Sequence, residues 1–424
     1  MLIAQGTTNW KASVRRWMRL LTVVTLTGCA AIPRGPAPPT YISTAAPVGF
    51  APNVRILSTD LASVQLSSTT TLQRLRSSSR DGIVRALVLS GGGAGGAFGA
   101  GALVGLSHRH QRPRFDAVTG VSAGALIAPF AFLGPETDAQ LTEAFTSGRA
   151  EEVSLHGLLS LPFGAPRRSA VLRSLVDHYV TLDLIKAVAN QAATGRFLWV
   201  ATTDLDKEET VIWDMGAIAT RGGEPARRLF RDVLVASASV PGLFEPVLIH
   251  VQQGGKLYDE MHVDGNASTS LFVAPAAAYF ALLDQRSLEG ARVYVLVNGR
   301  LIEAPETTPV RFGPIMSRTL ETAIKSMSKA QVIAVNQFAD KYHMSVESSY
   351  LPFDFPEYNS ADFSAATMRM LFNYGARCGE SGRLWTTVNQ TLTVLAEVTP
   401  SAGRAPTAEG AACPLRDGQL AELR

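Results

Sequence analysis

The sequence has 424 residues, of which 46% are apolar and 18% charged, with a formal net charge of +3. This composition is typical of a globular protein with a sizeable core and excludes a largely disordered chain. It shows no long basic stripe interleaved with aromatic side chains, so it also argues against nucleic acid as a partner.

The N-terminus has the charge and hydropathy pattern of an export signal. The apolar run LLTVVTLTG is too short to span a bilayer, but it has the length of a signal-peptide core. It ends in LTGC at positions 26–29, which resembles the lipobox of bacterial lipoproteins, and it follows four basic residues, Lys11, Arg15, Arg16 and Arg19. We therefore predict a signal peptide over residues 1–28 and a lipidated Cys29. A plain signal peptide with an incidental cysteine is the alternative, and the arginine pair fits ordinary signal charge better than a twin-arginine signal.

Export determines what is expected of the remaining cysteines and of location. Ala30 follows Cys29, with no aspartate to retain the protein at the inner membrane, so lipoprotein sorting predicts an outer-membrane protein facing the periplasm. In that oxidising compartment Cys378 and Cys413 could form a disulfide. The alternative is a buried Cys378 and a free Cys413 on a mobile tail.

Composition divides the exported chain into three parts. Residues 29–81 are rich in proline, serine and threonine, which predicts an extended tether that could contain a short helix. A folded domain is expected over residues 82–390. Residues 391–424 are low in complexity and predict a loose tail.

Within the folded domain, strand-like and helix-like runs alternate. IVRALVLS (83–90), DAVTG (116–120), RFLWVATTDLD (196–206), ETVIWDMG (209–216) and ARVYVLVNG (291–299) predict strands. Helices are expected over GAFGAGALVGL (96–106), VSAGALIAPFAFLG (121–134), with Pro129 kinking or shortening it, RRLFRDVLVASASV (227–240) and 318–342. This alternation predicts an α/β layered fold around a mostly parallel sheet, and the glycines of the first helix suggest that it packs close to that sheet.

A glycine loop, SGGGAGGAFG, joins the first predicted strand to the first helix. Gly91, Gly93 and Gly96 fit a dinucleotide-binding pattern, but no acidic residue follows at the end of a second strand, and a P-loop is excluded because no Gly-Lys-Ser/Thr follows. Successive glycine amides can also form a concave set of donors that stabilises an oxyanion. The loop therefore favours acyl transfer if a nucleophile lies near it.

The stretch GVSAG, residues 120–124, provides such a nucleophile. It places Ser122 between two glycines at a predicted strand-to-helix junction, which is how many hydrolases present a serine. The serine needs a base. His250 and His262 are candidates for a Ser–His–Asp arrangement, and the Asp-Gly turn at Asp264 offers a carboxylate that could act directly.

The ordered set GGGAGG, GVSAG, ASASVPGLFEPV (236–247) and VDG resembles the patatin-like phospholipase family, and DFSAATMRMLFNYG (362–375) is similar to that family's C-terminal helical part. The resemblance covers roughly residues 83–385. It implies a three-layer α/β/α fold and a lipid acyl hydrolase of phospholipase A or lysophospholipase type that needs no metal or cofactor. It further implies Ser122 as nucleophile, Asp264 as base and Gly91, Gly92 and Gly93 as the oxyanion loop.

Two positions depart from the family pattern. Gly95 stands where the family usually has arginine or lysine, and Asn266 stands where a small residue usually follows Asp-Gly. The missing charge leaves open a catalytically dead lipid-binding lipoprotein, beside the Ser–His–Asp esterase. Membrane lipids are the expected substrates, the lipidated cysteine is the expected anchor, and no protein partner is predicted.

Overall fold

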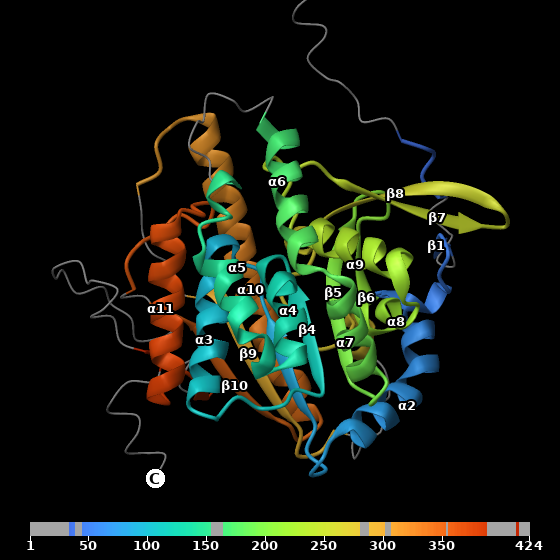
Figure 1. The fold of residues 1–424 in the computed structure, drawn as a ribbon, viewed down its shortest axis with the longest axis horizontal. Helices are drawn as coiled ribbons and strands as arrows, with labels where there is room; N and C mark the ends of the chain where they lie inside the picture. The colour runs from blue at the N-terminus through green and yellow to red at the C-terminus, as the bar shows by residue number, and fades with distance from the viewer. Residues whose placement is uncertain are drawn as a thin grey trace, which may run out of the picture.

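The computed structural model describes residues 34–38, 45–153, 164–279, 288–301, 307–352, 355–387 and 413–414 (Figure 1). The predicted signal peptide, Cys29 and most of the predicted tail lie outside these residues. The expected domain organisation at the two ends is therefore compared with the structure only where the chain is described.

A single eleven-stranded sheet forms the centre of the molecule, with the path β1-β7-β8-β5-β4-β3-β9-β10-β11 and β6 joining β2 to β5. The strands β5, β4, β3, β9 and β10 run parallel to their neighbours, whereas the pairings on both flanks are antiparallel. The strands are β1 (Ala46–Pro47), β2 (Arg55–Leu57), β3 (Arg85–Leu89), β4 (Ala117–Val121), β5 (Phe197–Asp204), β6 (Glu209–Asp214), β7 (Val247–Gln253), β8 (Lys256–Asp264), β9 (Arg292–Arg300), β10 (Ser345–Leu351) and β11 (Thr386–Thr387).

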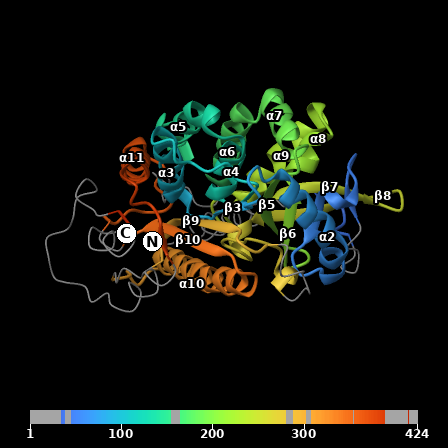
Figure 2. The same ribbon diagram turned by 90° about the horizontal axis from the view of Figure 1, so that it is seen from below.

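Helices cover both faces of this sheet, which gives the predicted three-layer α/β/α fold (Figure 2). One face carries α3 (Gly96–His108), α4 (Ala123–Leu133), α5 (Asp138–Thr146), α6 (Gly164–Tyr179), α7 (Leu182–Ala192), α8 (Met215–Thr220), α9 (Gly223–Ser237) and α11 (Ala365–Ser381). The other face carries α2 (Leu61–Ser78) and α10 (Phe312–Lys341). No helix of the described residues combines the length and the apolar character needed to cross a bilayer.

The topology brings the sequence motifs together at the carboxyl ends of the parallel strands. The glycine loop follows β3, Ser122 follows β4, and Asn298 lies near the end of the parallel neighbour β9. Asp264 ends the antiparallel β8 and pairs with Thr202 in β5. Ligands of open α/β sheets bind outside the carboxyl ends of parallel strands, so these ends are where a site is expected.

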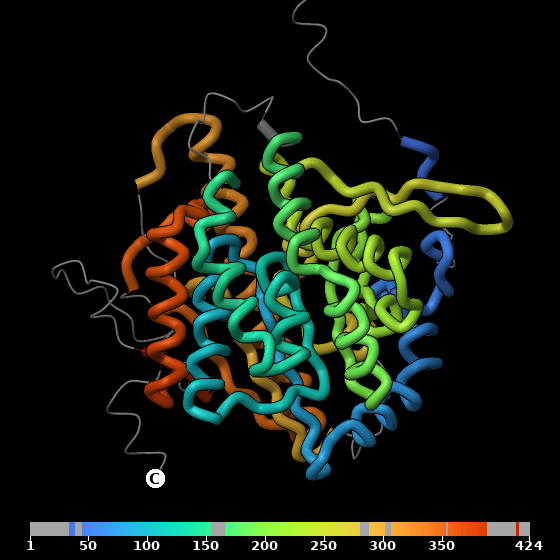
Figure 3. The backbone as a smooth tube through the Cα atoms, in the orientation of Figure 1, coloured from blue at the N-terminus to red at the C-terminus, as the bar shows by residue number. Residues whose placement is uncertain are grey.

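The glycines of α3 serve a helix contact as well as a sheet contact. A Cβ on Gly101 would lie 2.0 Å from the carbonyl oxygen of Phe372, and one on Gly105 would lie 2.1 Å from that of Ala376, both in α11. Gly99 instead faces β9, where a Cβ would lie 2.8 Å from a methyl of Leu296. Figure 3 shows α11 running beside α3. The expected sheet contact is thus only part of the reason for these glycines.

Pro129 does not end its helix. The helix α4 continues four residues beyond Pro129 and stops at Leu133, before Gly134 with φ of +114°. The segment is almost wholly buried, and tertiary packing holds the proline inside the helix.

The prediction of an extended tether over residues 29–81 is wrong for its second half. β1 pairs with β7, β2 pairs with β6, and α2 is an 18-residue helix capped by Asp60, whose carboxylate accepts a hydrogen bond from the Ser63 amide. The composition misled because only three residues of α2 are buried, namely Val64, Leu75 and Ser78. Its weak apolar face therefore left no clear helical period in the sequence.

Cys378 and Cys413 are joined by a disulfide, with Cα atoms 5.4 Å apart. Cys378 lies on α11, so the bridge ties a residue 35 positions later to the helix that packs on α3. The pair expected from the export pattern is thus the pair that the structure forms.

We expect reduction of this bridge to lower the unfolding midpoint. A loop of 35 residues stabilises the folded state by about 4 kcal/mol in the chain-entropy model. The measurement is thermal or urea unfolding with and without a thiol reductant, and the double variant Cys378→Ser/Cys413→Ser is the control, which a reductant should leave unchanged. Equal midpoints for the oxidised and reduced wild-type protein would contradict this expectation.

Candidate active site

Ser122 lies on a strained turn between β4 and α4. Its φ of 54° and ψ of −123° fall outside the regions that ordinary side chains favour, so the backbone turns sharply and holds the hydroxyl away from the start of the helix. A serine in this position would normally cap α4. Here it makes no cap hydrogen bond. The hydroxyl is therefore available to another partner.

That partner is Asp264. The Ser122 Oγ donates a hydrogen bond of 2.6 Å to Oδ2 of Asp264, and the two side chains come from positions 142 residues apart. Both residues are almost fully buried. The second oxygen, Oδ1, accepts a hydrogen bond of 2.8 Å from the backbone amide of Asn266, which fixes the carboxylate plane. Burial raises the pKa of Asp264 to about 7, although the hydrogen bonds from Ser122 and Asn266 act to lower it.

The stretch 236–247 makes hydrogen bonds to the backbone of both Ser122 and Asp264. Ser237 Oγ accepts from the Ser122 amide at 3.0 Å and donates to the Ala201 carbonyl at 2.7 Å. Two residues on, the Ser239 carbonyl accepts from the Asp264 amide at 2.9 Å. The end of α9 therefore fixes the backbone on each side of the Ser122–Asp264 contact. The sequence marked this stretch only as part of a family pattern, and the positioning role of Ser237 was missed.

The glycine loop after β3 lies against the start of α4. A Cβ on Gly96 would lie 2.8 Å from Cβ of Ala123, the residue that follows Ser122. Among the described residues, the amides of Gly92, Gly93 and Ala123 donate to no other group. The glycine loop and the start of α4 therefore both offer amides that are open to a ligand.

Gly91 is not available as an oxyanion donor, contrary to expectation. Its amide donates to the Ser270 carbonyl at 3.0 Å, which fixes the glycine loop to the segment that follows Asp264. Gln331 of α10 holds that segment in turn, because its Oε1 accepts from the Ser270 amide at 2.9 Å and the Leu271 amide at 3.0 Å. No sequence signal singled out Gln331.

The two departures from the family pattern have structural reasons. A Cβ on Gly95 would lie 2.1 Å from the Asn298 carbonyl oxygen and 2.7 Å from the Tyr358 hydroxyl, so no side chain fits there. The side-chain amide of Asn266 packs over Gly91, where a Cβ on the glycine would lie 2.1 Å from Nδ2 of Asn266. Asn266 thus requires glycine at position 91 and is part of the site's framework.

Neither candidate histidine reaches Ser122 through a hydrogen bond. His250 is exposed and pairs with Asp259 at 2.6 Å. His262 is fully buried, with Nδ1 2.9 Å from the Thr202 hydroxyl and Nε2 3.4 Å from Glu260. The structure therefore gives the Ser–His–Asp alternative no support from hydrogen bonding.

His262 belongs to a buried ionic cluster formed by side chains of β8 and β5. Its ring, Asp204 and Glu260 place possible metal-ligand atoms within 4.8 Å of one another. The Lys207 ammonium already lies 3.1 Å from Asp204 and 2.5 Å from Glu260, and Arg55 also pairs with Glu260. Burial alone would raise the pKa of Glu260, but its bonds to His262 and Arg55 hold that pKa well below its usual value. Two protein cations thus fill the role that a metal would take.

A buried serine on a strained turn, a carboxylate bonded to it and open glycine amides are the components of an acyl-hydrolase site. Residues 87–277 match the family model of the patatin-like phospholipases, a range that includes the glycine loop, Ser122 and Asp264. The crystal structure of VipD from Legionella pneumophila is similar over 71% of this chain and 67% of its own, with 13% identity and a TM-score of 0.31. Comparison with curated proteins gives no significant match.

The raised pKa of Asp264 predicts a pH-dependent penalty to folding. The carboxyl ionises near 3.8 when unperturbed and near 7 in the folded protein, so stability from this group is present below about pH 4 and is lost as the pH rises to about 7. Asp264→Asn removes this titration. As the pH rises across that range, the unfolding free energy of the variant should increase relative to that of the wild type, by at most about 1.4 kcal/mol per pH unit. Melting curves at several pH values test this, and a gap that stays constant from pH 4 to 8 would contradict it.

Proposed function

We propose that the protein is a lipid acyl hydrolase of the phospholipase A or lysophospholipase type, with Ser122 as nucleophile and Asp264 as base. The observation that carries the proposal is the 2.6 Å hydrogen bond between Ser122 Oγ and Asp264 Oδ2 in a buried site. The family match over residues 87–277 supports lipid acyl hydrolysis as the general activity.

The proposed reaction has two halves. Asp264 accepts the Ser122 proton as Oγ attacks the ester carbonyl, and the resulting oxyanion accepts hydrogen bonds from the amides of Gly92, Gly93 and Ala123. Collapse of this intermediate breaks the ester bond, Asp264 returns the proton to the departing alcohol, and the acyl group remains on Ser122. Water then attacks the acyl-enzyme, giving its proton to Asp264 and, after collapse, releasing the fatty acid and restoring Ser122.

The pKa of Asp264 suits this role. A base that ionises near 7 holds its proton more tightly than an ordinary carboxylate, and general-base catalysis is most effective when the pKa lies near the working pH. The same value implies that activity falls as the pH decreases below about 7, because the protonated carboxyl cannot accept the serine proton.

An exposed apolar surface at the start of α10 supports a lipid substrate. The first turns of α10 expose Phe312, Ile315, Met316 and Leu320, and Val310 lies two residues before the helix; Phe312 and Val310 are 82% and 94% exposed. Further along the same helix, Gln331 holds the loop that binds the glycine segment. Apolar side chains gathered on one exposed helix end are typical of surfaces that meet membranes or apolar partners.

We also propose that Cys29 is lipidated and that the protein faces the periplasm from the outer membrane. The support is the order of charge, apolar run and LTGC, followed by Ala30. Two or more acyl chains give stable anchoring, since each buried methylene contributes about 0.8 kcal/mol.

Ser122→Ala and Asp264→Asn should each reduce hydrolysis of a short-chain ester to background while the protein stays folded, and the double variant should be no worse than either single one. His250→Ala is the matched control and should retain wild-type turnover. Near-normal turnover by Asp264→Asn, or loss of turnover in His250→Ala, would contradict the Ser–Asp mechanism. No turnover by the wild-type protein on any ester would favour a binding protein.

Cys29→Ser should move the full chain from the membrane fraction to the soluble fraction. The measurement is fractionation of cells before and after an alkaline wash, with mass spectrometry of the mature N-terminus. An outer-membrane lipoprotein of known sorting serves as the reference. Retention of the variant after the wash would count against lipid anchoring.

A further inference from the structure

The face of the sheet under α2 contains an apolar cavity of about 580 Å³. Its walls come from α2, from strands β3, β4, β5, β6 and β9 and from the end of α10, with Leu75, Trp199, Ile212, Phe338 and Met344 among the larger side chains. The weak apolar face of α2 explains the space, because so few of its side chains fill the gap. Protein sites for small ligands commonly enclose 300 to 1,000 Å³, and apolar cavities bind apolar ligands.

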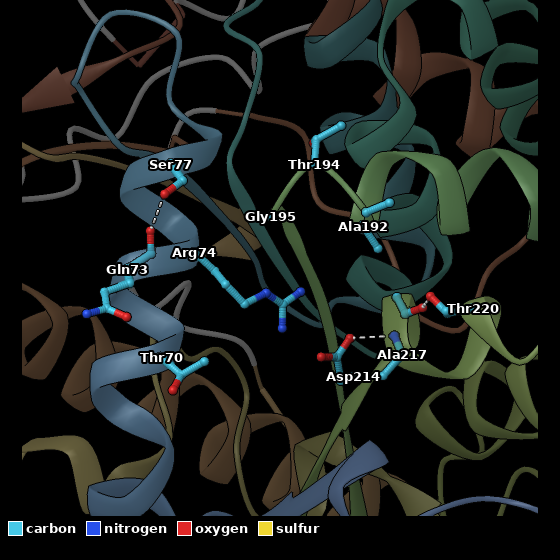
Figure 4. A pocket seen from close by; sticks show the side chains of 12 residues that line it. Thr70, Gln73, Arg74, Ser77, Ala192, Thr194, Gly195, Asp214, Ala217 and Thr220 are labelled. Carbon is cyan, nitrogen blue, oxygen red and sulfur yellow. Dashed lines mark hydrogen bonds between the residues drawn. The ribbon is translucent and has the colours of Figure 1, made fainter.

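A second cleft of about 500 Å³ adjoins this cavity (Figure 4). It lies between α2 and the turn before β5, and its lining is rich in hydroxyl groups, namely Thr70, Ser77, Thr194 and Thr220. Thr70, Arg74, Asp214 and Ala217 line both spaces, so the cleft and the apolar cavity meet at these four residues.

Arg74 lies where the two spaces meet. Its guanidinium stacks over the Phe197 ring, 4.2 Å from the ring centre, and reaches from α2 toward Asp214 (Figure 4). Among the described residues, the Arg74 guanidinium makes no hydrogen bond or ion pair, although its charge acts on Asp214. Asp214 is instead held by the Ala217 amide at 2.8 Å, and burial raises its pKa, which weakens it as a counter-ion. Arg74 therefore presents open donors at the edge of an apolar space.

The other cations on the cavity wall are Arg55, Lys207 and Arg292, and Arg292 hydrogen-bonds Tyr294. Arg55 and Lys207 both pair with Glu260 in the buried cluster. An anionic headgroup entering from the cleft would thus meet Arg74, and its alkyl chain would continue into the cavity. Leu66 of α2, which is 87% exposed and also lines the cavity, offers an apolar rim.

We propose that the cleft and the cavity together form a second lipid site, which binds a long-chain fatty acid with its carboxylate on Arg74 and its chain beneath α2. The site lies away from the candidate catalytic serine, because Phe197 pairs with Ala117 at the amino end of β4 whereas Ser122 follows the carboxyl end. This inference goes beyond the proposed function, since the cavity's chemistry alone defines the ligand and no turnover is needed.

Calorimetry of palmitate with the full-length Ser122→Ala protein tests the proposal, because this background removes turnover at Ser122. Palmitate should bind saturably, and Arg74→Ala should weaken that binding at least tenfold. Arg80→Ala is the matched control, an exposed arginine outside both linings, and should leave binding unchanged. Hexadecanol, which lacks the carboxylate, should bind with an affinity that does not depend on Arg74.

A second variant tests the cavity itself. Ala274→Phe places a large side chain in the cavity wall and should abolish Arg74-dependent binding, with circular dichroism as the check on folding. A lysophospholipid titrated in parallel distinguishes the two sources of an anionic chain, and tighter Arg74-dependent binding of the lysophospholipid would overturn the fatty-acid assignment. Palmitate binding that is absent, or equal in Arg74→Ala, would overturn the site. Either result is independent of whether Ser122 variants lose hydrolysis.

Discussion

A buried carboxylate that pairs with no cation of the described residues is the constraint around which this part of the fold is arranged. Asp264 is almost fully buried. Its carboxylate accepts hydrogen bonds from the Ser122 hydroxyl and the Asn266 backbone amide, neither of which carries a charge. Burying an ionised group is costly unless it is paired, so the carboxyl shifts its pKa to about 7 instead. The nearby cations serve a separate cluster, where Arg55 and Lys207 neutralise Glu260 and Asp204. The fold thus raises the pKa of Asp264 and holds the pKa of Glu260 well below its usual value.

Contacts from distant parts of the chain preserve this arrangement. Ser237 at the end of α9 binds the Ser122 amide, Ser239 binds the Asp264 amide, and Gln331 of α10 fixes the loop that holds Gly91. Each bond is made by a backbone amide, so a small displacement of the end of α9 would move Ser122 and Asp264, and a displacement of α10 would move the loop that holds Gly91. The strained φ of Ser122 can persist because these contacts and the burial of α4 over-determine it.

The sequence predicted most of the fold's centre because its strands are short apolar runs between clear turn residues, as in β3, β4 and β9. It predicted Ser122 and Asp264 through the glycine-bounded serine and the family pattern, and the structure brings the two together. It could not show that the Gly91 amide is taken by Ser270, since that depends on how a loop 179 residues later folds back. It misjudged residues 45–78 because α2 buries too few apolar side chains to show a helical period. That same deficiency leaves the cavity beneath the helix.

The central claim is that buried Asp264 activates Ser122 as a nucleophile. The most direct measurement is covalent trapping of the full-length protein with an alkyl fluorophosphonate, which reacts with activated serines, followed by peptide mass spectrometry across pH. The account predicts one adduct, on Ser122, with a labelling rate that rises with pH through a midpoint near 7 and falls at least a hundredfold in Asp264→Asn. Labelling of a different serine, or an Asp264→Asn protein that labels at the wild-type rate, would contradict it.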